Sequence, residues 1–314
     1  MELKHLNFSL TDSTTYAGKQ LTDLYSTLLL AGNTIKNIKV LPGIKDKAII
    51  PNFNAGNVIQ AKSGCAGTAS GEGTLDDKTI TVCPFEILLE LCVTTFEQNY
   101  LSEQMKAGSN TGEVAPAAFV DYVVKEVLSK AGDGIERMFW QGNTTASPAA
   151  SYPLNLCDGL EKKMLADGDV VDVNSTISPA TVTSSNVLAE LEKGFNLIPA
   201  AVYSQGTENL RIYMSSNVHR AYKMAQATNL AGGLFFKDQI DTFAGIPVIL
   251  ASGMSDNNYV IAHPDNLILG TDIASDLEAL KVVPKNDYQD ILVFKSNFKV
   301  GFEYFKGAEI VWYA

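Results

Sequence analysis

Few of the side chains that usually carry out catalysis occur in this sequence of 314 residues. Its three histidines, His5, His219 and His263, lie in no H-E-x-x-H or G-x-S-x-G pattern. His219 falls at the start of an expected helix and His263 directly precedes a proline, so we interpret both as structural histidines. No pair of carboxylates is distinguished as a general acid and base. We therefore predict no catalytic residue and expect that the protein is not an enzyme.

Two short stretches resemble ligand-binding loops, but each lacks a required residue. The acidic stretch 167–174, DGDVVDVN, departs from an EF-hand loop because Val171 replaces an oxygen ligand and Asp172 replaces the glycine. We expect a loop of solvated carboxylates there. The glycines of residues 108–115, GSNTGEVA, lack the G-K-[ST] that a phosphate-binding loop requires. The sequence thus predicts no metal ion and no cofactor.

Lysine and asparagine side chains offer one covalent possibility. A lysine of an extended hairpin, Lys45, Lys47 or Lys62, could attack the side chain of Asn266 in a neighbouring copy and form an isopeptide bond. The sequence gives no means of placing these atoms together. We therefore favour solvated lysines and an asparagine in a turn.

The N-terminus and the cysteines both point to synthesis and folding in a cytoplasm. The first ten residues, MELKHLNFSL, lack the basic start and the apolar core of a signal peptide. No apolar run approaches the roughly 18 residues that cross a bilayer. The four cysteines, Cys65, Cys83, Cys92 and Cys157, form no C-x-x-C pair. In a reducing compartment we expect them to be small buried hydrophobic residues and not disulfides.

The composition describes a folded, acidic protein. Hydrophobic residues make up 46% and charged residues 19% of the chain, which is enough to bury a sizeable core. The length fits one large domain or two. A net charge of −11 argues against a protein that grips nucleic acid, because such binding depends on Lys and Arg displacing counterions.

The first 82 residues are expected to form an arm and an extended hairpin. Leucines at helical spacing predict a short helix over 15–31. Runs rich in Val and Ile then predict β-strands at 37–41, 47–53, 57–61 and 78–82. Residues 62–77, between the last two runs, are mostly Gly, Ala, Ser and other small residues. An isolated ribbon of this kind is marginal in water, so we expect it to pack on another chain. The alternative is a floppy surface hairpin on an ordinary enzyme.

A long amphipathic helix dominates the next segment. The apolar run 84–95 fits a strand or a helix, and we favour a strand that leads into a short helix over 95–108. Apolar residues at steps of three and four then predict one continuous helix over 116–140. Trp140 at its end is expected to pack beneath a neighbouring layer. After Gly142 the chain runs through small residues before a helix restarts at Asp158, as expected where one subdomain passes to another.

The second half predicts an α/β module followed by long strands. We expect helices over 158–168 and 183–195, the second capped by Ser or Thr, and a strand, turn and helix over 209–226. A pair of strands is expected at 243–254 and 257–270. Further β runs cover 280–287, 290–305 and 308–314, and burial should hold the C-terminus in place.

This order of elements resembles the major capsid proteins of tailed bacteriophages, which share the Hong Kong 97-type fold with encapsulin shells. The resemblance covers nearly the whole chain, and each matching stretch is weakly specific by itself. The stretches that carry it are IKVLPGIKDKAIIP (38–51), VVKEVLSKAGDGIERMFWQG (123–142), CDGLEKKML (157–165), GIPVILASGM (245–254), YVIAHPDNLILG (259–270) and FKVGFEYFKGAEIVWY (298–313).

The resemblance implies an α+β chain with five parts. They are an N-terminal arm at 1–36, an extended β-hairpin or E-loop at 37–82, a peripheral domain with the spine helix at 83–150, an axial α/β domain at 151–274, and returning strands at 275–314. It also implies a mechanical function. Copies form the hexamers and pentamers of an icosahedral shell that encloses double-stranded DNA without binding it specifically, and each hairpin lies across its neighbour.

The partners implied by the resemblance are other copies, a portal protein and decoration proteins, with no membrane. Because the chain begins directly at the arm, we expect a separate scaffolding protein, assembly in a bacterial cytoplasm and a final location in the virion. No set of crosslinking residues carries over. Two alternatives remain: an encapsulin-type compartment built around cargo enzymes, and a cytosolic α/β enzyme.

Overall fold

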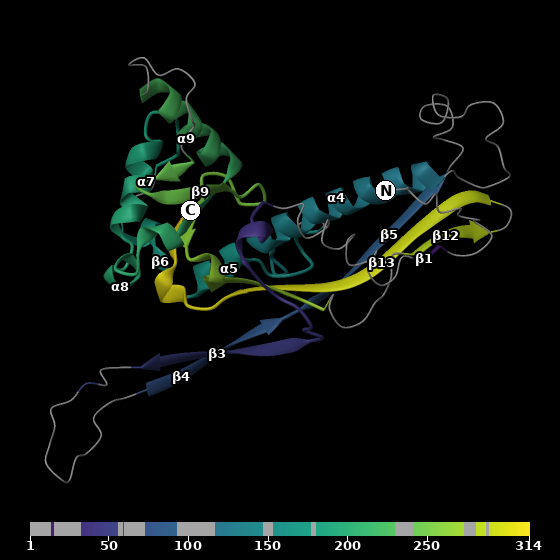
Figure 1. The fold of residues 1–314 in the computed structure, drawn as a ribbon, viewed down its shortest axis with the longest axis horizontal. Helices are drawn as coiled ribbons and strands as arrows, with labels where there is room; N and C mark the ends of the chain where they lie inside the picture. Colours follow the sequence, from purple (N-terminus) through teal and green to yellow (C-terminus); the bar gives the residue numbers. More distant parts are fainter. Residues whose placement is uncertain are drawn as a thin grey trace, which may run out of the picture.

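A computed structural model describes residues 14–15, 33–55, 59, 73–92, 117–146, 153–176, 180–229, 241–272, 281–286 and 289–314. Figure 1 shows a long sheet beside helix α4, a compact module of short helices and strands, and a two-stranded ribbon that projects away from both. The expected α+β class is confirmed. The predicted helices over 15–31 and 95–108, the run 57–61 and the loop 108–115 lie almost entirely outside the described residues.

The long sheet is organised around β13, the longest strand of the described chain. Its strands run in the order β1-β12-β13-β11-β2, and β5 pairs with β13 off this path. The bounds are β1 Thr14–Thr15, β2 Lys39–Leu41, β5 Cys83–Cys92, β11 Leu267–Thr271, β12 Lys281–Asn286 and β13 Gln289–Tyr304. The favoured strand over 84–95 is therefore confirmed at β5, which pairs antiparallel with residues 291–300 of β13.

Helix α4, Ala117–Gln141, confirms the long helix predicted over 116–140. Its C-terminal turn lies between the two sheets. The ring of Phe139 meets Phe302 of β13 edge to face at 5.5 Å, while Trp140 lies 5.8 Å from Tyr213 of the compact module. The side chains of Phe139 and Trp140 are both completely buried. Trp140 thus packs beneath a neighbouring layer, as predicted.

The segment after α4 folds back on itself, so that the backbones at Gly142 and Gly159 are in direct contact. Gly142 accepts a hydrogen bond from the backbone N–H of Gly159 at 2.8 Å. A Cβ atom on Gly142 would lie 2.2 Å from the carbonyl oxygen of Cys157, so only glycine fits. Asp158 accepts hydrogen bonds from the backbone and hydroxyl of Thr144, both at 2.8 Å. Helix α5, Leu160–Ala166, then begins two residues after the predicted restart at Asp158.

The compact module contains a second sheet with strand order β6-β14-β10-β7-β9-β8. Its strands are β6 Val171–Asp172, β7 Arg211–Met214, β8 Thr242–Phe243, β9 Ile246–Leu250, β10 Tyr259–Ala262 and β14 Val311–Tyr313. Its helices are α6 Val173–Thr176, α7 Val187–Asn196, α8 Ala200–Tyr203 and α9 Ser216–Asn229. The strand, turn and helix predicted over 209–226 are confirmed at β7 and α9. Strand β14 is buried, which confirms that the C-terminus is held in place.

Three details predicted for this module were wrong. The run 257–270 is not one strand but two, β10 and β11, which belong to different sheets and are separated by a 3-10 helix at Pro264–Asn266. Strand β9 does not pair with β10, because β7 lies between them. Helix α7 starts after Asn186 and has no side-chain cap, whereas a Ser or Thr cap was expected.

The prediction for the cysteines was also wrong. Cys83 and Cys157 form a disulfide across 74 positions of sequence. They meet because β5 begins beside the segment that connects α4 to α5. Cys92 lies further along β5 with an exposed side chain, and Cys65 is outside the described residues.

Candidate functional site

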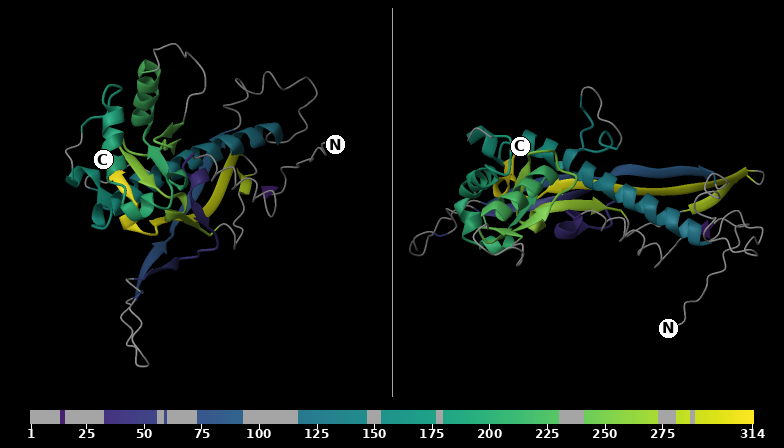
Figure 2. Two further views of the ribbon diagram at one scale, coloured as in Figure 1. Left: turned by 60° about the vertical axis from the view of Figure 1, so that its left-hand side comes forward. Right: turned by 90° about the horizontal axis from the view of Figure 1, so that it is seen from above.

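The ribbon consists of β3, Lys47–Ala55, and β4, Gly73–Thr81, paired antiparallel. Figure 1 and the left view of Figure 2 show that it extends away from the rest of the molecule. The strands predicted at 47–53 and 78–82 are confirmed. Strand β4 begins earlier than predicted, at Gly73, because residues 73–77 complete the ladder with β3 although their side chains are mostly small or polar.

The two faces of the ribbon differ in exposure. Ile50 and Ile80 point toward the body and are 8% and 0% exposed. The opposite face carries Ile49, Phe53 and Leu75, which are 67%, 65% and 65% exposed. Phe53 and Leu75 are directly opposed across the two strands. Side chains alternate between the faces of a strand, so this ribbon presents one anchored face and one outward apolar face.

The anchored face has a small core of its own. Buried residues from the ribbon, from the chain just before and just after it, and from β11 form one hydrophobic cluster: Ile44, Ile50, Ile80, Val82 and Ile268. The base of the ribbon therefore packs on its own chain, whereas the sequence predicted that the ribbon packs on another chain. For the outward face of the described strands, packing on another chain stays a prediction, because the apolar side chains of that face lie in solvent.

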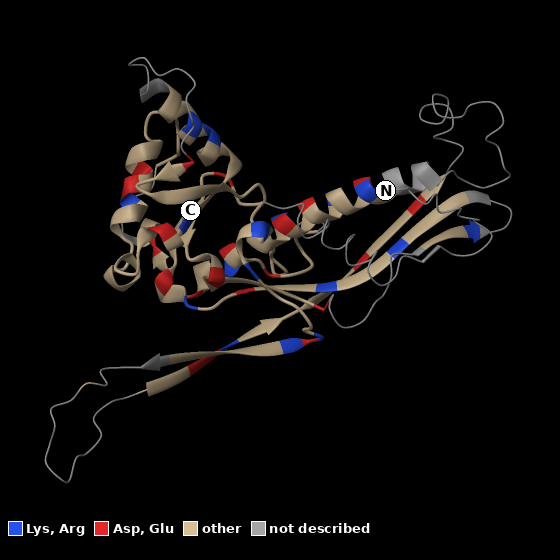
Figure 3. Cartoon of the chain, viewed as in Figure 1, with Lys and Arg blue, Asp and Glu red and all other residues tan. Residues whose placement is uncertain are grey.

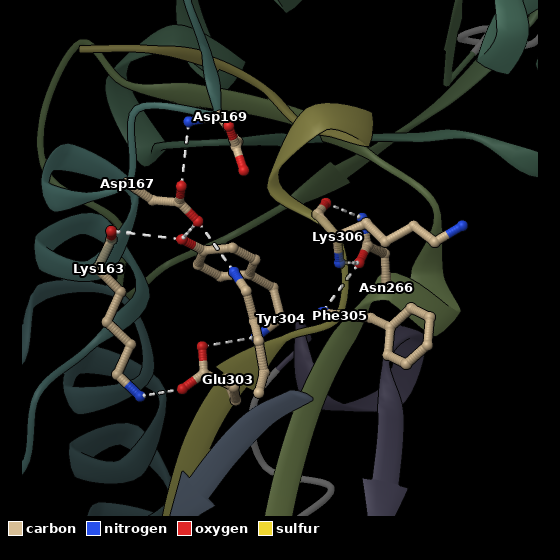
Figure 4. Close-up of polar contacts among 9 residues, drawn as sticks. Lys163, Asp167, Asp169, Asn266, Glu303, Tyr304, Phe305 and Lys306 are labelled. Carbon is tan, nitrogen blue, oxygen red and sulfur yellow. Dashed lines mark hydrogen bonds and ion pairs between the residues drawn. The ribbon is translucent and has the colours of Figure 1, made fainter. Parts of the chain in front are cut away.

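An ion pair and a ring reinforce this base. The ammonium of Lys78, on β4, lies 2.9 Å from Oδ2 of Asp167 and 3.8 Å from the centre of the Tyr304 ring. The hydroxyl of Tyr304 donates to the same carboxylate oxygen at 2.6 Å (Figure 4). We call Lys78, Asp167 and Tyr304 the clamp. Because its members come from β4, the end of α5 and the end of β13, the clamp joins the ribbon to both other parts of the chain.

The clamp changes the ionisation of Asp167. Partial burial acts to raise its pKa, but the hydrogen bonds from Tyr304, Lys78 and the backbone N–H of Asp169 outweigh burial and lower the pKa to about 2. Burial and the neighbouring carboxylate raise the pKa of Tyr304, so its hydroxyl stays protonated and donates. The loop 167–174 is thus not a set of solvated carboxylates, because its first carboxylate is held at the base of the ribbon.

Further contacts hold the same region together. Lys163 of α5 pairs with Glu303 of β13 at 2.7 Å (Figure 4). Strand β13 also passes close to the end of β4. A Cβ atom on Gly301 would lie 2.3 Å from the carbonyl oxygen of Thr81 and 3.0 Å from the Cα of Val82. The absence of a side chain at position 301 therefore lets the two strands cross.

No protein-family model and no curated protein matches this sequence. Solved structures do match over most of its length. Of three such structures, two are described as a procapsid or a capsid, and the third carries the name of a phage alone. They are a satellite phage P4 procapsid (11% identity, 93% of this chain and 98% of the other, TM-score 0.59), a Gordonia phage Cozz structure (13%, 90% and 85%, 0.56) and the capsid of an empty GTA particle (14%, 90% and 89%, 0.55). At these identities the likeness concerns the fold. The chain has the Hong Kong 97-type capsid fold. In its terms the ribbon is the E-loop and α4 is the spine helix.

The residues considered for an isopeptide bond can now be placed in this fold, and Asn266 has a structural role. The amide oxygen of Asn266 accepts from the backbone N–H groups of Phe305 and Lys306 at 3.0 and 2.7 Å, and its amide group donates to the carbonyl of Lys306 (Figure 4). Asn266 is 5% exposed, so its side chain serves to hold the end of β13. Lys45 and Lys47 have exposed side chains near the base of the ribbon, and Lys62 is outside the described residues.

The histidines fit the same interpretation. Nδ1 of His263 accepts the backbone N–H of Asp265 at 3.2 Å and so caps the 3-10 helix between β10 and β11. His219 lies in α9, where burial lowers its pKa. His5 lies outside the described residues. In the described part of the chain, no cluster of His, Cys, Asp and Glu is placed to hold a metal ion, and no helix has the length and apolar character to cross a membrane.

The clamp was not predicted from the sequence. Lys78 and Asp167 are 89 positions apart, and Tyr304 is a further 137 positions from Asp167. No local spacing joins them. The one signal available was the isolated lysine in a strand otherwise rich in Thr and Asp, which did not indicate a partner.

Proposed function

We propose that this chain is the major capsid protein of a tailed bacteriophage. Its copies form hexamers and pentamers, which build an icosahedral shell around a double-stranded DNA genome. The observation that carries this proposal is the pairing of an anchored base with an outward apolar face on the ribbon. The capsid fold supports a role for this chain in forming a shell. In this proposal the outward face of the ribbon makes the contact between copies.

The outward face favours a second copy as its partner. Ile49, Phe53 and Leu75 are each about two-thirds exposed, and removing each from water stabilises a contact by about 1–2 kcal/mol. The ribbon cannot turn back to cover this face without separating Ile50 and Ile80 from their cluster and breaking the clamp. An exposed apolar face held rigidly away from its own body is typical of an interaction site. In a closed assembly, a neighbouring copy supplies the missing surface at every position.

The charge distribution fits a container that does not grip DNA. The chain carries a net charge of −11, and Figure 3 shows that basic and acidic residues are interspersed along α4. On the long sheet, Glu90 pairs with Lys285 at 2.6 Å and Glu86 pairs with Lys295 at 3.3 Å. Lysines that are already paired with carboxylates contribute little to binding of phosphates. DNA enclosed by such a shell stays movable.

The remaining details belong to the same proposal. The domain boundaries are those given by the resemblance: the arm at 1–36, the E-loop at 37–82, the peripheral domain at 83–150, the axial domain at 151–274 and the returning strands at 275–314. Assembly takes place in the bacterial cytoplasm with a separate scaffolding protein, and the finished shell also contains a portal protein and decoration proteins.

Electron microscopy of the purified chain tests this proposal. We expect closed shells in negative stain, and DNA with a portal protein in shells isolated from infected cells. Shells that instead contain an enzyme cargo would indicate an encapsulin-type compartment. Elution of the chain as a single 33.9 kDa copy under all assembly conditions, with or without a scaffolding protein, would contradict both kinds of shell.

A further inference from the structure

The disulfide between Cys83 and Cys157 lies at the base of the ribbon. Cys83 is the first residue of β5 and follows β4 after a single residue, Val82. Cys157 lies in the segment that connects α4 to α5. The two Cα atoms are 5.9 Å apart, a separation that is usual for disulfides. The bond therefore joins the base of the ribbon to the connection between the long sheet and the compact module.

This bond and the clamp hold the ribbon to the same helix by different chemistry. Asp167 follows the last residue of α5, and its contact with Lys78 is ionic. Cys157 precedes the first residue of α5 by three positions, and its bond to Cys83 is covalent. Only the covalent tie depends on the redox state of the surroundings. Reduction removes the covalent tie, and the clamp and the small hydrophobic cluster still hold the base of the ribbon.

We propose that the Cys83–Cys157 bond is a redox-sensitive joint that sets how firmly the ribbon is held. Both residues are thiols while the chain is made in a reducing cytoplasm. The bond forms when the protein meets an oxidising medium, which for a shell is the medium outside the lysed cell. This timing rests on the proposed function, whereas the bond itself is a property of the single chain.

The different exposure of the two sulfurs gives the order of the reaction. The oxidant is a low-molecular-weight disulfide such as oxidised glutathione. Cys83 is half-buried, so its thiolate attacks one sulfur of the small disulfide, forms a mixed disulfide and releases one small thiolate. Cys157 is 4% exposed and reacts second. Its thiolate attacks the sulfur of Cys83 and releases the second small thiolate, and the protons of both cysteines go to solvent.

Oxidation restricts the opened states of the chain more than the folded state. The bond closes a loop of 74 positions that contains β5 and α4, and such closure removes conformational freedom from any state in which the ribbon base has separated. We therefore expect slower opening of the ribbon in the oxidised protein. The native contacts of Ile50, Ile80 and Lys78 remain the same in both redox states.

Peptide mapping and hydrogen exchange test the proposal on the full chain, kept anaerobic with reductant or treated with oxidised glutathione. After oxidation we expect a linked peptide that contains Cys83 and Cys157, and amide exchange in residues 73–81 slowed by about tenfold or more. The double variant Cys83→Ser/Cys157→Ser should exchange at the reduced rate under both conditions. The variant Cys92→Ser changes an exposed cysteine of the same strand and should keep the full redox response.

The possible results test the redox-sensitive joint and the proposed shell function independently of each other. Complete alkylation of Cys83 and Cys157 after the oxidising treatment overturns the joint, as does equal exchange in the two redox states, and neither result bears on whether shells form. A linked peptide and slowed exchange in a chain that never assembles support the joint and contradict the shell.

Discussion

The Nζ atom of Lys78 lies 2.9 Å from Oδ2 of Asp167, and this ion pair joins the ribbon strand β4 to the end of α5. The side chains are only 25% and 22% exposed. Tyr304 covers the ammonium with its ring and donates its hydroxyl to the carboxylate. The pair thus fixes a projecting element to two parts of the body at once. The direction of the ribbon is therefore a property of the folded chain.

Replacing Lys78 should loosen the base of the ribbon. Lys78→Ala removes a partly buried ion pair and a cation–π contact, and we expect the free energy of unfolding to fall by about 1–2 kcal/mol. Urea unfolding measures this change. Lys285→Ala is the matched control, because its pair with Glu90 is 41% and 48% exposed and should contribute less than about 0.5 kcal/mol. Equal effects of the two variants would show that the clamp has no special role.

Acid should weaken the clamp over a defined range of pH. The pKa of Asp167 is lowered from its ordinary value of 3.8 to about 2, so the folded chain binds a proton there less readily than the unfolded chain. The stability contributed by the carboxylate is present above pH 3.8 and is lost as the pH falls toward 2. The melting temperature of Asp167→Asn should lie below that of the unmodified chain at pH 6. This difference should shrink between about pH 4 and pH 2, and a difference at pH 2 as large as that at pH 6 would contradict the assignment.

A side chain at position 301 should force the ribbon away from β13. Gly301→Ala would place its Cβ atom 2.3 Å from the carbonyl oxygen of Thr81, and we expect destabilisation of about 1–3 kcal/mol from the overpacking. Thermal unfolding measures the loss. Gly168→Ala is the control, since nothing lies within 4 Å of its Cβ position and its effect should stay within about 0.5 kcal/mol. An unchanged melting temperature for Gly301→Ala would mean that the strands do not cross there.

Charges on the outward face should block assembly without unfolding the chain. Phe53→Asp and Leu75→Asp place carboxylates at side chains that are already 65% exposed, so circular dichroism should be unchanged. Shells should be absent in electron micrographs, because a charge would be buried between copies. Leu165→Asp tests the same change at a leucine of α5 that is 73% exposed. Normal assembly of the ribbon variants, or equal failure of Leu165→Asp, would show that the outward face is not the decisive contact.

The sequence predicted those elements whose residues share a strong period or a strong propensity. Helix α4 follows from its apolar stripe, and β3 follows from the short apolar run that contains Ile49 and Ile50. The resemblance to the capsid family predicted how these elements are arranged in the fold. The order of the elements is specific for the family even though each matching stretch is weakly specific by itself. Strands β10 and β11 were merged, since both are buried throughout and the turn at His263 interrupts the apolar run only briefly.

The base of the ribbon was harder to predict because it depends on distant contacts. Lys78, Asp167 and Tyr304 meet only after three elements have packed, and no short pattern records that meeting. The disulfide was missed for a different reason. The expectation of a reducing compartment excluded it, although Cys83 lies between the predicted runs 78–82 and 84–95 and Cys157 directly precedes the predicted helix start at Asp158.

Reconstruction of assembled particles by cryo-electron microscopy tests the central claim most directly. We predict that residues 47–55 and 73–81 of each copy lie across an adjoining copy, with Ile49, Phe53 and Leu75 buried between the two. A ribbon whose outward face remains in solvent in the assembled particle, or folds onto its own body, would contradict the account.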